Sequence, residues 1–450
     1  MLFRSSFREK FHHFQELLNA NDLVHKYMSD FGEMIVGGNL FSKGYASQLY
    51  KGLYDNTLRI VKNLIIMSHG KHQELLDKAM ELGNSCDEIL RPRVFCPEGL
   101  DCQDADCPNC TKYENNPSKI PYYYSLADID TGHEFETGAK MSRLGEISAK
   151  LGIPVPEGFC LTIRLFEDIM TNENLREKKN EIFYNVDFGN IAQVIRASRD
   201  AQALLISIPI LQSVEDIILE AYDKCFGKDT GIKLAVRSSA RGEDGASHSF
   251  AGLHYSALNV GRESLVDACL EVLISKYSPQ SVVYRYINGL RDEDMPMSVG
   301  CIRMIDAIAG GVLFTNHSES NILINAVYGL GSLVVEGRAA PQKFIVSRSK
   351  PYEVKAFSAG SQKYKNVVKS GEGLEKAPVD ENINTKPCLG KDQITELCGY
   401  AMMIEGHFGA AQDIEWAIDK SGKIYILQAR PMKMQQQILI RQANIDLVVL

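Results

Sequence analysis

The polar residues with the clearest chemical potential lie in residues 412–431. Asp413 and Glu415 are separated by one residue, and Gln428 and Arg430 repeat that spacing after a turn. Two carboxylates beside a carboxamide and a guanidinium suit a magnesium ion that holds a polyphosphate, because Mg²⁺ prefers oxygen ligands and is usually bound by one or two carboxylates plus phosphates. The alternative interpretation is the solvated face of an amphipathic hairpin.

A β-hairpin is predicted to position these four side chains. Ile414, Trp416 and Ile418 alternate with less apolar residues, which is the period of a half-buried strand. Gly422 completes a tight turn, and Pro431 ends a second strand. The first strand is therefore expected to bury one face and to present the carboxylates on the other.

The register of this hairpin follows from the turn. We expect Ile418 to pair with Lys423, which places Asp413 opposite Gln428 and Glu415 opposite Ile426. Directly opposed residues of an antiparallel pair share a face. One face then carries Asp413, Glu415, Gln428 and Arg430, and the other carries Trp416 and Tyr425.

Two earlier segments place a cation next to small residues. Lys140 follows Gly138 at the start of a predicted helix, and Arg237 follows the apolar run 234–236 and precedes a small-residue loop that Gly252 closes. Free backbone N–H groups at such places suit phosphate. We expect Arg237 to reach the floor of a cleft and to be unpaired until phosphate binds. The alternative is a surface cation, because Lys140 lacks the Gly-x-x-x-x-Gly-Lys-Ser/Thr pattern of a P-loop.

The composition is that of an ordinary globular protein. The 450 residues are 45% hydrophobic and 24% charged, with a net charge of −8, and the length allows two or three domains. The acidic balance argues against a broad surface for nucleic acid or anionic membrane. No apolar run reaches the length of a membrane span, and the N-terminus lacks the apolar core of a signal peptide. Eleven cysteines, an odd number, fit a cytoplasmic protein with reduced thiols.

Two segments precede the predicted α/β region. Residues 1–94 repeat apolar side chains at helical spacing between glycine breaks, which predicts an all-helical domain. Residues 95–125 are a Cys-rich linker or a small zinc site, since four thiolates can hold Zn²⁺ in tetrahedral geometry. A polar linker with reduced thiols and a structural disulfide are the alternatives. The four candidate zinc ligands are Cys96, Cys102, Cys107 and Cys110.

The remainder is predicted to be one large α/β domain. It is expected to span residues 126–435, with a helical insert at about 171–228. Residues 436–450 are interpreted as the start of a linker or of another domain. Because the sequence ends inside a predicted strand, we expect the chain to stop short of a natural boundary.

Five motifs in this region, taken in order, resemble the N-terminal ATP-binding domain of the phosphoenolpyruvate synthase and pyruvate phosphate dikinase family. The resemblance covers roughly two-thirds of the chain. It implies an ATP-grasp fold, in which two α/β subdomains clamp ATP. The motifs are Gly-Ala-Lys…Leu-Gly-Glu at 138–146, Gly-Ile-Pro-Val-Pro-Glu-Gly-Phe at 152–159, Ala-Val-Arg-Ser-Ser-Ala…Glu-Asp…Ser-Phe-Ala-Gly at 235–252, Gly-Leu-Gly at 329–331 and Asp-Ile-Glu-Trp-Ala…Leu-Gln-Ala-Arg-Pro at 413–431.

The resemblance also implies roles for individual residues. Lys140, Arg237 and Arg430 would be the catalytic residues at the phosphates, and Asp413, Glu415 and Gln428 would hold Mg²⁺. Residues 242–252 would form a mobile loop that closes over the nucleotide. The residues expected to contact ATP are Lys140, Arg237, Gly242, Gly252, Glu336, Gln428 and Arg430.

The function implied by the resemblance is that of an ATP-dependent phosphotransferase. It would pass phosphate from MgATP to a histidine on another domain or chain, and onward to pyruvate or to another acceptor. In the family that histidine lies in a Gly-Gly-x-x-Ser-His type of loop, and none of the ten histidines here has that context. The alternative is a non-catalytic nucleotide-binding or regulatory module whose helical domain binds a partner.

Overall fold

The computed structural model describes most of the chain in two compact units. The first unit contains the N-terminal helices, and the second contains residues 120–281 and 296–432, apart from short gaps. The described residues are 2–36, 43–68, 70–90, 120–170, 173–184, 186, 188, 190–207, 211–227, 231–240, 255–287, 292, 295–318 and 320–432.

Three long helices make up most of the first unit. The second helix packs against both the first and the third. Gly52 allows a close approach, because a Cβ there would lie 2.3 Å from the ring of Tyr27. An ion pair of 3.0 Å joins Arg59 to Glu16 across the first two helices. The helices are α1 (Leu2–Val36), α2 (Lys43–Met67) and α3 (Gln73–Leu90).

A five-stranded antiparallel sheet forms one half of the second unit. Its order is β1-β2-β5-β3-β4. Successive residues of β5 point to opposite faces, so Gly300 lies against Met141 on one side while Cys301 contacts Cys269 on the other. The strands are β1 (Tyr123–Ser125), β2 (Gly158–Leu161), β3 (Leu234–Ala240), β4 (Ser256–Val260) and β5 (Met297–Arg303).

Two helices cover the faces of this sheet, and further short helices follow in the chain. The helix that contains Cys269 covers one face, and the helix that contains Met141 lies on the other. The helices are α6 (Ile163–Met170), α7 (Glu173–Tyr184), α8 (Ile191–Ile206), α9 (Gln212–Phe226), α10 (Leu265–Ile274) and α11 (Pro279–Ile287), with 3₁₀ turns η2 (Leu126–Asp128), η3 (Thr131–His133) and η4 (Ser275–Tyr277).

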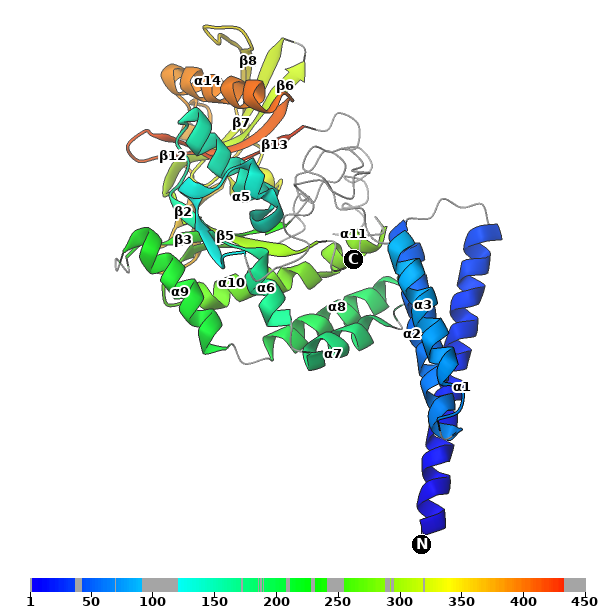
Figure 1. Ribbon diagram of the computed structural model, residues 1–450. Coiled ribbons are helices and arrows are strands. Elements are labelled where there is room, and N and C mark those ends of the chain that lie inside the picture. Colours follow the sequence, from blue (N-terminus) through cyan, green and yellow to red (C-terminus); the bar gives the residue numbers. More distant parts are fainter. Residues whose placement is uncertain are drawn as a thin grey trace. The chain divides into compact units, whose positions relative to one another are not determined.

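A six-stranded antiparallel sheet forms the other half, in the order β13-β12-β6-β7-β8-β9. The helix α14 (Lys391–Phe408) lies across one face of it (Figure 1). The strands are β6 (Ala307–Ser318), β7 (Asn321–Tyr328), β8 (Gln342–Ser347), β9 (Val354–Ser358), β12 (Gln412–Asp419) and β13 (Ile424–Pro431), and the smaller elements are the β10 (Tyr364–Val368) and β11 (Leu374–Pro378) ribbon, α12 (Ser332–Val335) and α13 (Glu381–Asn384).

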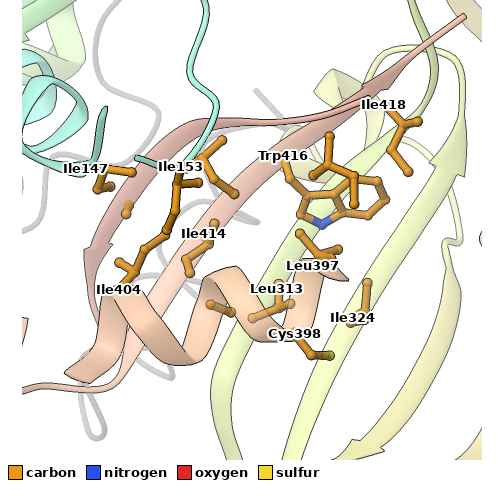
Figure 2. Close-up of a cluster of buried hydrophobic side chains, with 14 of the residues drawn as sticks. Ile147, Ile153, Leu313, Ile324, Leu397, Cys398, Ile404, Ile414, Trp416 and Ile418 are labelled. Carbon is orange, nitrogen blue, oxygen red and sulfur yellow. The ribbon is translucent and has the colours of Figure 1, made fainter. Parts of the chain in front are cut away.

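The core of this half is the apolar layer between the sheet and α14. Trp416 is fully buried there, and Leu397 and Ile404 of the helix face the sheet (Figure 2). Ile147 joins the same cluster from a different helix (Figure 2). Burying a large apolar side chain stabilises the fold by about 1.5–3 kcal/mol, so this layer fixes which face of the hairpin points inward.

The helix α5 (Glu134–Leu151) connects the two halves, because it contacts both β3 and β13. Its first turn is interrupted at Gly138, whose φ of 73° and ψ of 163° lie in a region that is essentially restricted to glycine. At the end of the helix, Gly152 adopts the left-handed conformation that is common at helix C-termini.

The predicted fold class is confirmed: a mixed α/β structure follows an N-terminal helical region. None of the helices in the described part of the chain has the length and apolar character needed to cross a bilayer. The boundaries predicted near residues 94, 125 and 435 stay predictions. The four cysteines proposed as zinc ligands lie outside the described residues.

Candidate active site

The turn of the β12–β13 hairpin differs from the predicted register. Ile418 pairs with Ile424 rather than with Lys423. Tyr425 consequently lies opposite Ala417, and directly opposed residues share a face. The prediction that Tyr425 lies on the face of the buried tryptophan is therefore wrong.

A β-bulge adds a second shift farther along the hairpin. Trp416 lies opposite Ile426, but the preceding residue, Glu415, lies opposite Gln428. Leu427 is thus one extra residue on β13. Such bulges locally disrupt the ladder and re-aim the side chains that follow.

The two shifts together preserve the polar face. One residue at the turn and one at the bulge add up to two, which returns the later side chains to the predicted side, because the side-chain period of a strand is two. Asp413 lies directly opposite Arg430, and Glu415 lies directly opposite Gln428. The prediction that these four residues share one face is confirmed, although the predicted partners are wrong.

Asp413 is bound by the arginine opposite to it. Arg430 donates two hydrogen bonds to Asp413 Oδ2, from Nε at 3.0 Å and from Nη2 at 2.7 Å. The Asp413 side chain is only 13% exposed. Burial raises the pKa of Asp413, Arg430 opposes that effect, and the nearby Glu415 adds to it. The carboxylate is therefore held in a site that favours a compensating cation.

Arg237 connects the two sheets. Its Nη1 donates to the carbonyl oxygen of Leu427 at 2.7 Å, its Nη2 donates to Gln428 Oε1 at 2.8 Å, and Nη2 lies 3.6 Å from Glu415 Oε2. The expectation that this guanidinium is unpaired until phosphate arrives is wrong. The bulge explains the difference, because an extra residue leaves a carbonyl outside the strand ladder where a cation can reach it.

The turn that carries Lys140 is fixed against β3. The Met141 N–H donates to Ser239 Oγ at 3.2 Å, and the Ser298 hydroxyl contacts the carbonyl oxygens of Thr137 and Ser239. Ser239 lies in the motif at 235–252, whereas Ser298 lies in none of the five motifs. Arg237 lies two residues before Ser239 on the same strand, so the turn that carries Lys140 packs against the strand that carries Arg237.

Three further candidate residues, Glu336, Gly242 and Gly252, are predicted to contact the nucleotide. Glu336 follows α12 and pairs with Arg338 at 3.0 Å, and its side chain is 43% exposed. Gly242 and Gly252 lie outside the described residues. The structure leaves the roles of all these residues as predictions.

A cavity in the second unit is separate from this polar cluster. Its volume is about 570 Å³, and it is bounded by β1, β2 and α9. None of the candidate nucleotide-binding or metal-binding residues that the structure describes lines it. The charged cluster and this cavity are therefore distinct features of the second unit.

The donor set fits a magnesium ion that shares its coordination with phosphates. Asp413 and Glu415 supply two carboxylates on one face, which is the usual protein contribution to such a site. Among the described residues, no cluster of three or more His, Cys, Asp or Glu side chains could hold a metal by itself. Phosphate oxygens and water would supply the remaining ligands.

Comparison with known proteins identifies the family. A model of the pyruvate phosphate dikinase AMP/ATP-binding domain matches residues 135–445. The chain is 32% identical over 312 residues to a probable phosphoenolpyruvate synthase of Archaeoglobus fulgidus, covering 68% of this chain and 41% of that protein. It is 31% identical over 322 residues to the phosphoenolpyruvate synthase of Neisseria meningitidis (67% and 40%) and 30% identical over 340 residues to that of Escherichia coli (70% and 42%).

These relatives are longer than the matched region. The chain spans about two-fifths of the length of each of them. The matched region includes α5, β3 and the β12–β13 hairpin, and thus every described residue of the candidate site. The chain belongs to the family of the pyruvate phosphate dikinase AMP/ATP-binding domain.

Proposed function

We propose that this chain is the ATP-binding half of a phosphoenolpyruvate synthase-like dikinase. It transfers a phosphoryl group from MgATP to a histidine carried by another domain or by another chain, and pyruvate is one candidate final acceptor. The observation that carries the proposal is a convergence of charged and polar side chains where β3 of one sheet meets the β12–β13 hairpin of the other, a region that we call the seam. These side chains are Arg237, Asp413, Glu415, Gln428 and Arg430.

Phosphoryl transfer needs positioning and charge neutralisation more than covalent chemistry from the protein. In the proposal, Arg237 and Arg430 turn their guanidinium groups from the carboxylates to phosphate oxygens, where each can bind in a bidentate manner. Lys140 approaches the same phosphates from the turn at Gly138. Mg²⁺, held by Asp413 and Glu415, would neutralise charge on the phosphate chain.

The ion pairs between the acids and the arginines support this scheme on electrostatic grounds. Asp413–Arg430 and Glu415–Arg237 keep the acids and cations mutually compensated before the ligand arrives. MgATP brings both a cation for the acids and anions for the arginines, so each charged side chain exchanges one partner for another. After this exchange, the charges are already placed around the phosphates and need little further rearrangement during the reaction.

The test is a charge-removing, shape-preserving double variant, Asp413→Asn with Glu415→Gln. Loss of two charge-assisted interactions at about 1.5–3 kcal/mol each predicts a fall in MgATP affinity on the order of 10²-fold or more. Isothermal calorimetry measures the affinity, and isotope exchange into ATP measures phosphoryl transfer. Thermal melting checks that the variant is folded.

The outcomes separate two functions. Binding of MgATP together with exchange supports the transferase, when a family phosphohistidine domain is added in trans. Binding without exchange under those conditions supports the nucleotide-binding module instead. Unchanged affinity in the folded double variant would contradict the assignment of the acidic pair.

A further inference from the structure

Arg143, which is not among the predicted site residues, lies on the same face of α5 as Lys140. Arg143 is three residues after Lys140 on α5, and residues at this spacing are neighbours on a helix surface. Its guanidinium carbon lies 4.7 Å from the centroid of the Phe408 ring, at the end of α14. The strand that carries Asp413 begins four residues after Phe408.

Two nitrogen atoms of the Arg143 guanidinium are buried without acceptors in the part of the chain that the structure describes. Its Nε and Nη1 atoms are buried, and within the described part of the chain neither has a hydrogen-bond partner. Burying a polar donor without an acceptor costs free energy. A cation in this condition is therefore a candidate for binding an anion that is not part of the chain.

Nearby carboxylates already have other partners. Glu146, one turn farther along α5, accepts from the Thr131 N–H at 3.1 Å and lies 2.8 Å from His407 Nε2. Glu405, on the last turn of α14, is paired with Arg348. The acids closest to Arg143 along both helices are thus already engaged.

A second arginine shows what a structural cation of this kind looks like. The guanidinium carbon of Arg164 lies 4.0 Å from the centroid of the Tyr122 ring, a similar cation–π contact. Unlike Arg143, it also donates hydrogen bonds to the Ile120 carbonyl oxygen at 2.6 Å and to the Tyr122 hydroxyl at 3.2 Å. In this protein, a guanidinium that stacks on an aromatic ring can therefore also donate hydrogen bonds to acceptors.

We propose that Arg143 binds a phosphate group of the nucleotide, beyond the α-phosphate. The inference rests on the proposed ATP-binding function. It follows from the face shared with Lys140, from the contact of α5 with the strand that carries Gln428 and Arg430, and from the buried donors. The Phe408 ring holds the guanidinium plane, so its fork is oriented before phosphate arrives. Free inorganic phosphate offers the same chemistry, and the experiment distinguishes it from the nucleotide.

The test compares Arg143→Gln with Arg164→Gln in the full chain. Calorimetry with MgATP, with AMP and with inorganic phosphate gives the three affinities, and thermal melting without ligand gives stability. For Arg143→Gln we expect MgATP affinity to fall about ten- to hundredfold, AMP affinity to be unchanged, and the melting temperature to be unchanged or higher. For Arg164→Gln we expect a lower melting temperature and unchanged MgATP affinity.

Each other result overturns part of this assignment. Unchanged MgATP affinity in Arg143→Gln, with a melting temperature lowered as in Arg164→Gln, makes Arg143 a structural residue. Loss of inorganic phosphate binding alone overturns the nucleotide assignment and makes the free ion the ligand. If the wild-type chain binds no MgATP, the proposed function itself is wrong. This outcome is distinct from a failure of the Arg143 assignment, because it does not depend on any variant. Weakened AMP binding would overturn the placement beyond the α-phosphate.

Discussion

The two sheets of the second unit bring different charges to their seam. The five-stranded side contributes cations, with Arg237 on β3 and Lys140 on the helix packed against it. The six-stranded side contributes both acids, Asp413 and Glu415, together with Arg430. One acid is neutralised within its own hairpin and the other from across the seam. Arg237 is therefore the charged link between the halves.

This difference shows how such a site can be stable without ligand and still bind a polyanion. The hairpin is rigid, because its other face is anchored by Trp416 and Ile414 in the core (Figure 2). The turn that carries Lys140 depends instead on a few contacts with Ser239. Changes to this turn should therefore alter nucleotide affinity together with the packing of the turn.

The largest effect is expected when the turn that carries Lys140 is displaced from β3. A Cβ at Gly138 would lie 2.1 Å from the Ser239 carbonyl oxygen, and the backbone conformation there is essentially restricted to glycine. Gly138→Ala should destabilise the protein by more than about 3 kcal/mol, the upper end of the range for backbone strain alone. MgATP affinity should fall at least about tenfold, which corresponds to about 1.4 kcal/mol, because Lys140 moves with the turn.

Gly152→Ala is the matched control at the other end of the same helix. Its φ of 63° is also positive, but a Cβ there would meet nothing within 4 Å. We expect this variant to lose about 1–2 kcal/mol of stability through left-handed strain and to keep its MgATP affinity. Chemical denaturation and calorimetry measure both quantities. Equal losses in the two variants would show that the contact with Ser239 does not position the turn.

Patterns in the sequence predict more of the hairpin than of the seam. Alternation of Ile414, Trp416 and Ile418 is a local property, so the buried face could be read directly. The bulge at Leu427 could not, because one extra apolar residue between strand residues has no distinct composition. The pairing of Arg237 was also missed, since its acceptor is the carbonyl that this bulge exposes.

The same limit applies to α5. A Gly-x-Lys turn marks a place where a cation can approach a ligand, but the partners that fix the turn lie far away in sequence. Ser239 is 98 residues from Met141, and its Oγ accepts a hydrogen bond from the Met141 N–H. The shortage of acceptors around Arg143 is a property of packing against α14, and no spacing in the sequence indicates it.

An intermediate effect is expected when only the link between the sheets is weakened. Arg237→Lys keeps the charge but cannot satisfy the Leu427 carbonyl and Gln428 together in a planar fork. We expect MgATP affinity to fall about ten- to hundredfold, from a loss of about 1.5–3 kcal/mol. The ligand-free protein should also melt earlier, because the guanidinium is paired in that state.

Arg303→Lys is a suitable control for this variant. Arg303 makes an exposed pair with Glu157 at 2.9 Å, and exposed pairs contribute only about 0–1 kcal/mol. Its melting temperature and MgATP affinity should both stay near the wild-type values. An Arg237→Lys protein with wild-type stability but weakened MgATP binding would show that the link across the seam carries no folding energy.

The smallest effect concerns the acidic side alone and depends on pH. Burial raises the pKa of Asp413, and Glu415 adds to this, while Arg430 opposes it. The folded ligand-free protein therefore binds the Asp413 proton more readily than the unfolded chain does. By linkage, this contribution to stability is present below the ordinary aspartate pKa and is lost as pH rises through the raised value.

Asp413→Asn removes this titration while keeping the size of the side chain. The melting temperature of the wild type minus that of the variant should fall as pH rises through this window and then level off. Saturating MgATP should oppose the trend in the wild type, because metal ligands must be deprotonated and metal binding becomes stronger as the carboxylate ionises. Thermal melts at matched ionic strength from about pH 4 to pH 7, the range above an ordinary aspartate pKa, measure both slopes. A difference that rises with pH in the absence of ligand would mean that the pairing with Arg430 outweighs burial. Asp413 would then be stabilised as an ion before any metal arrives.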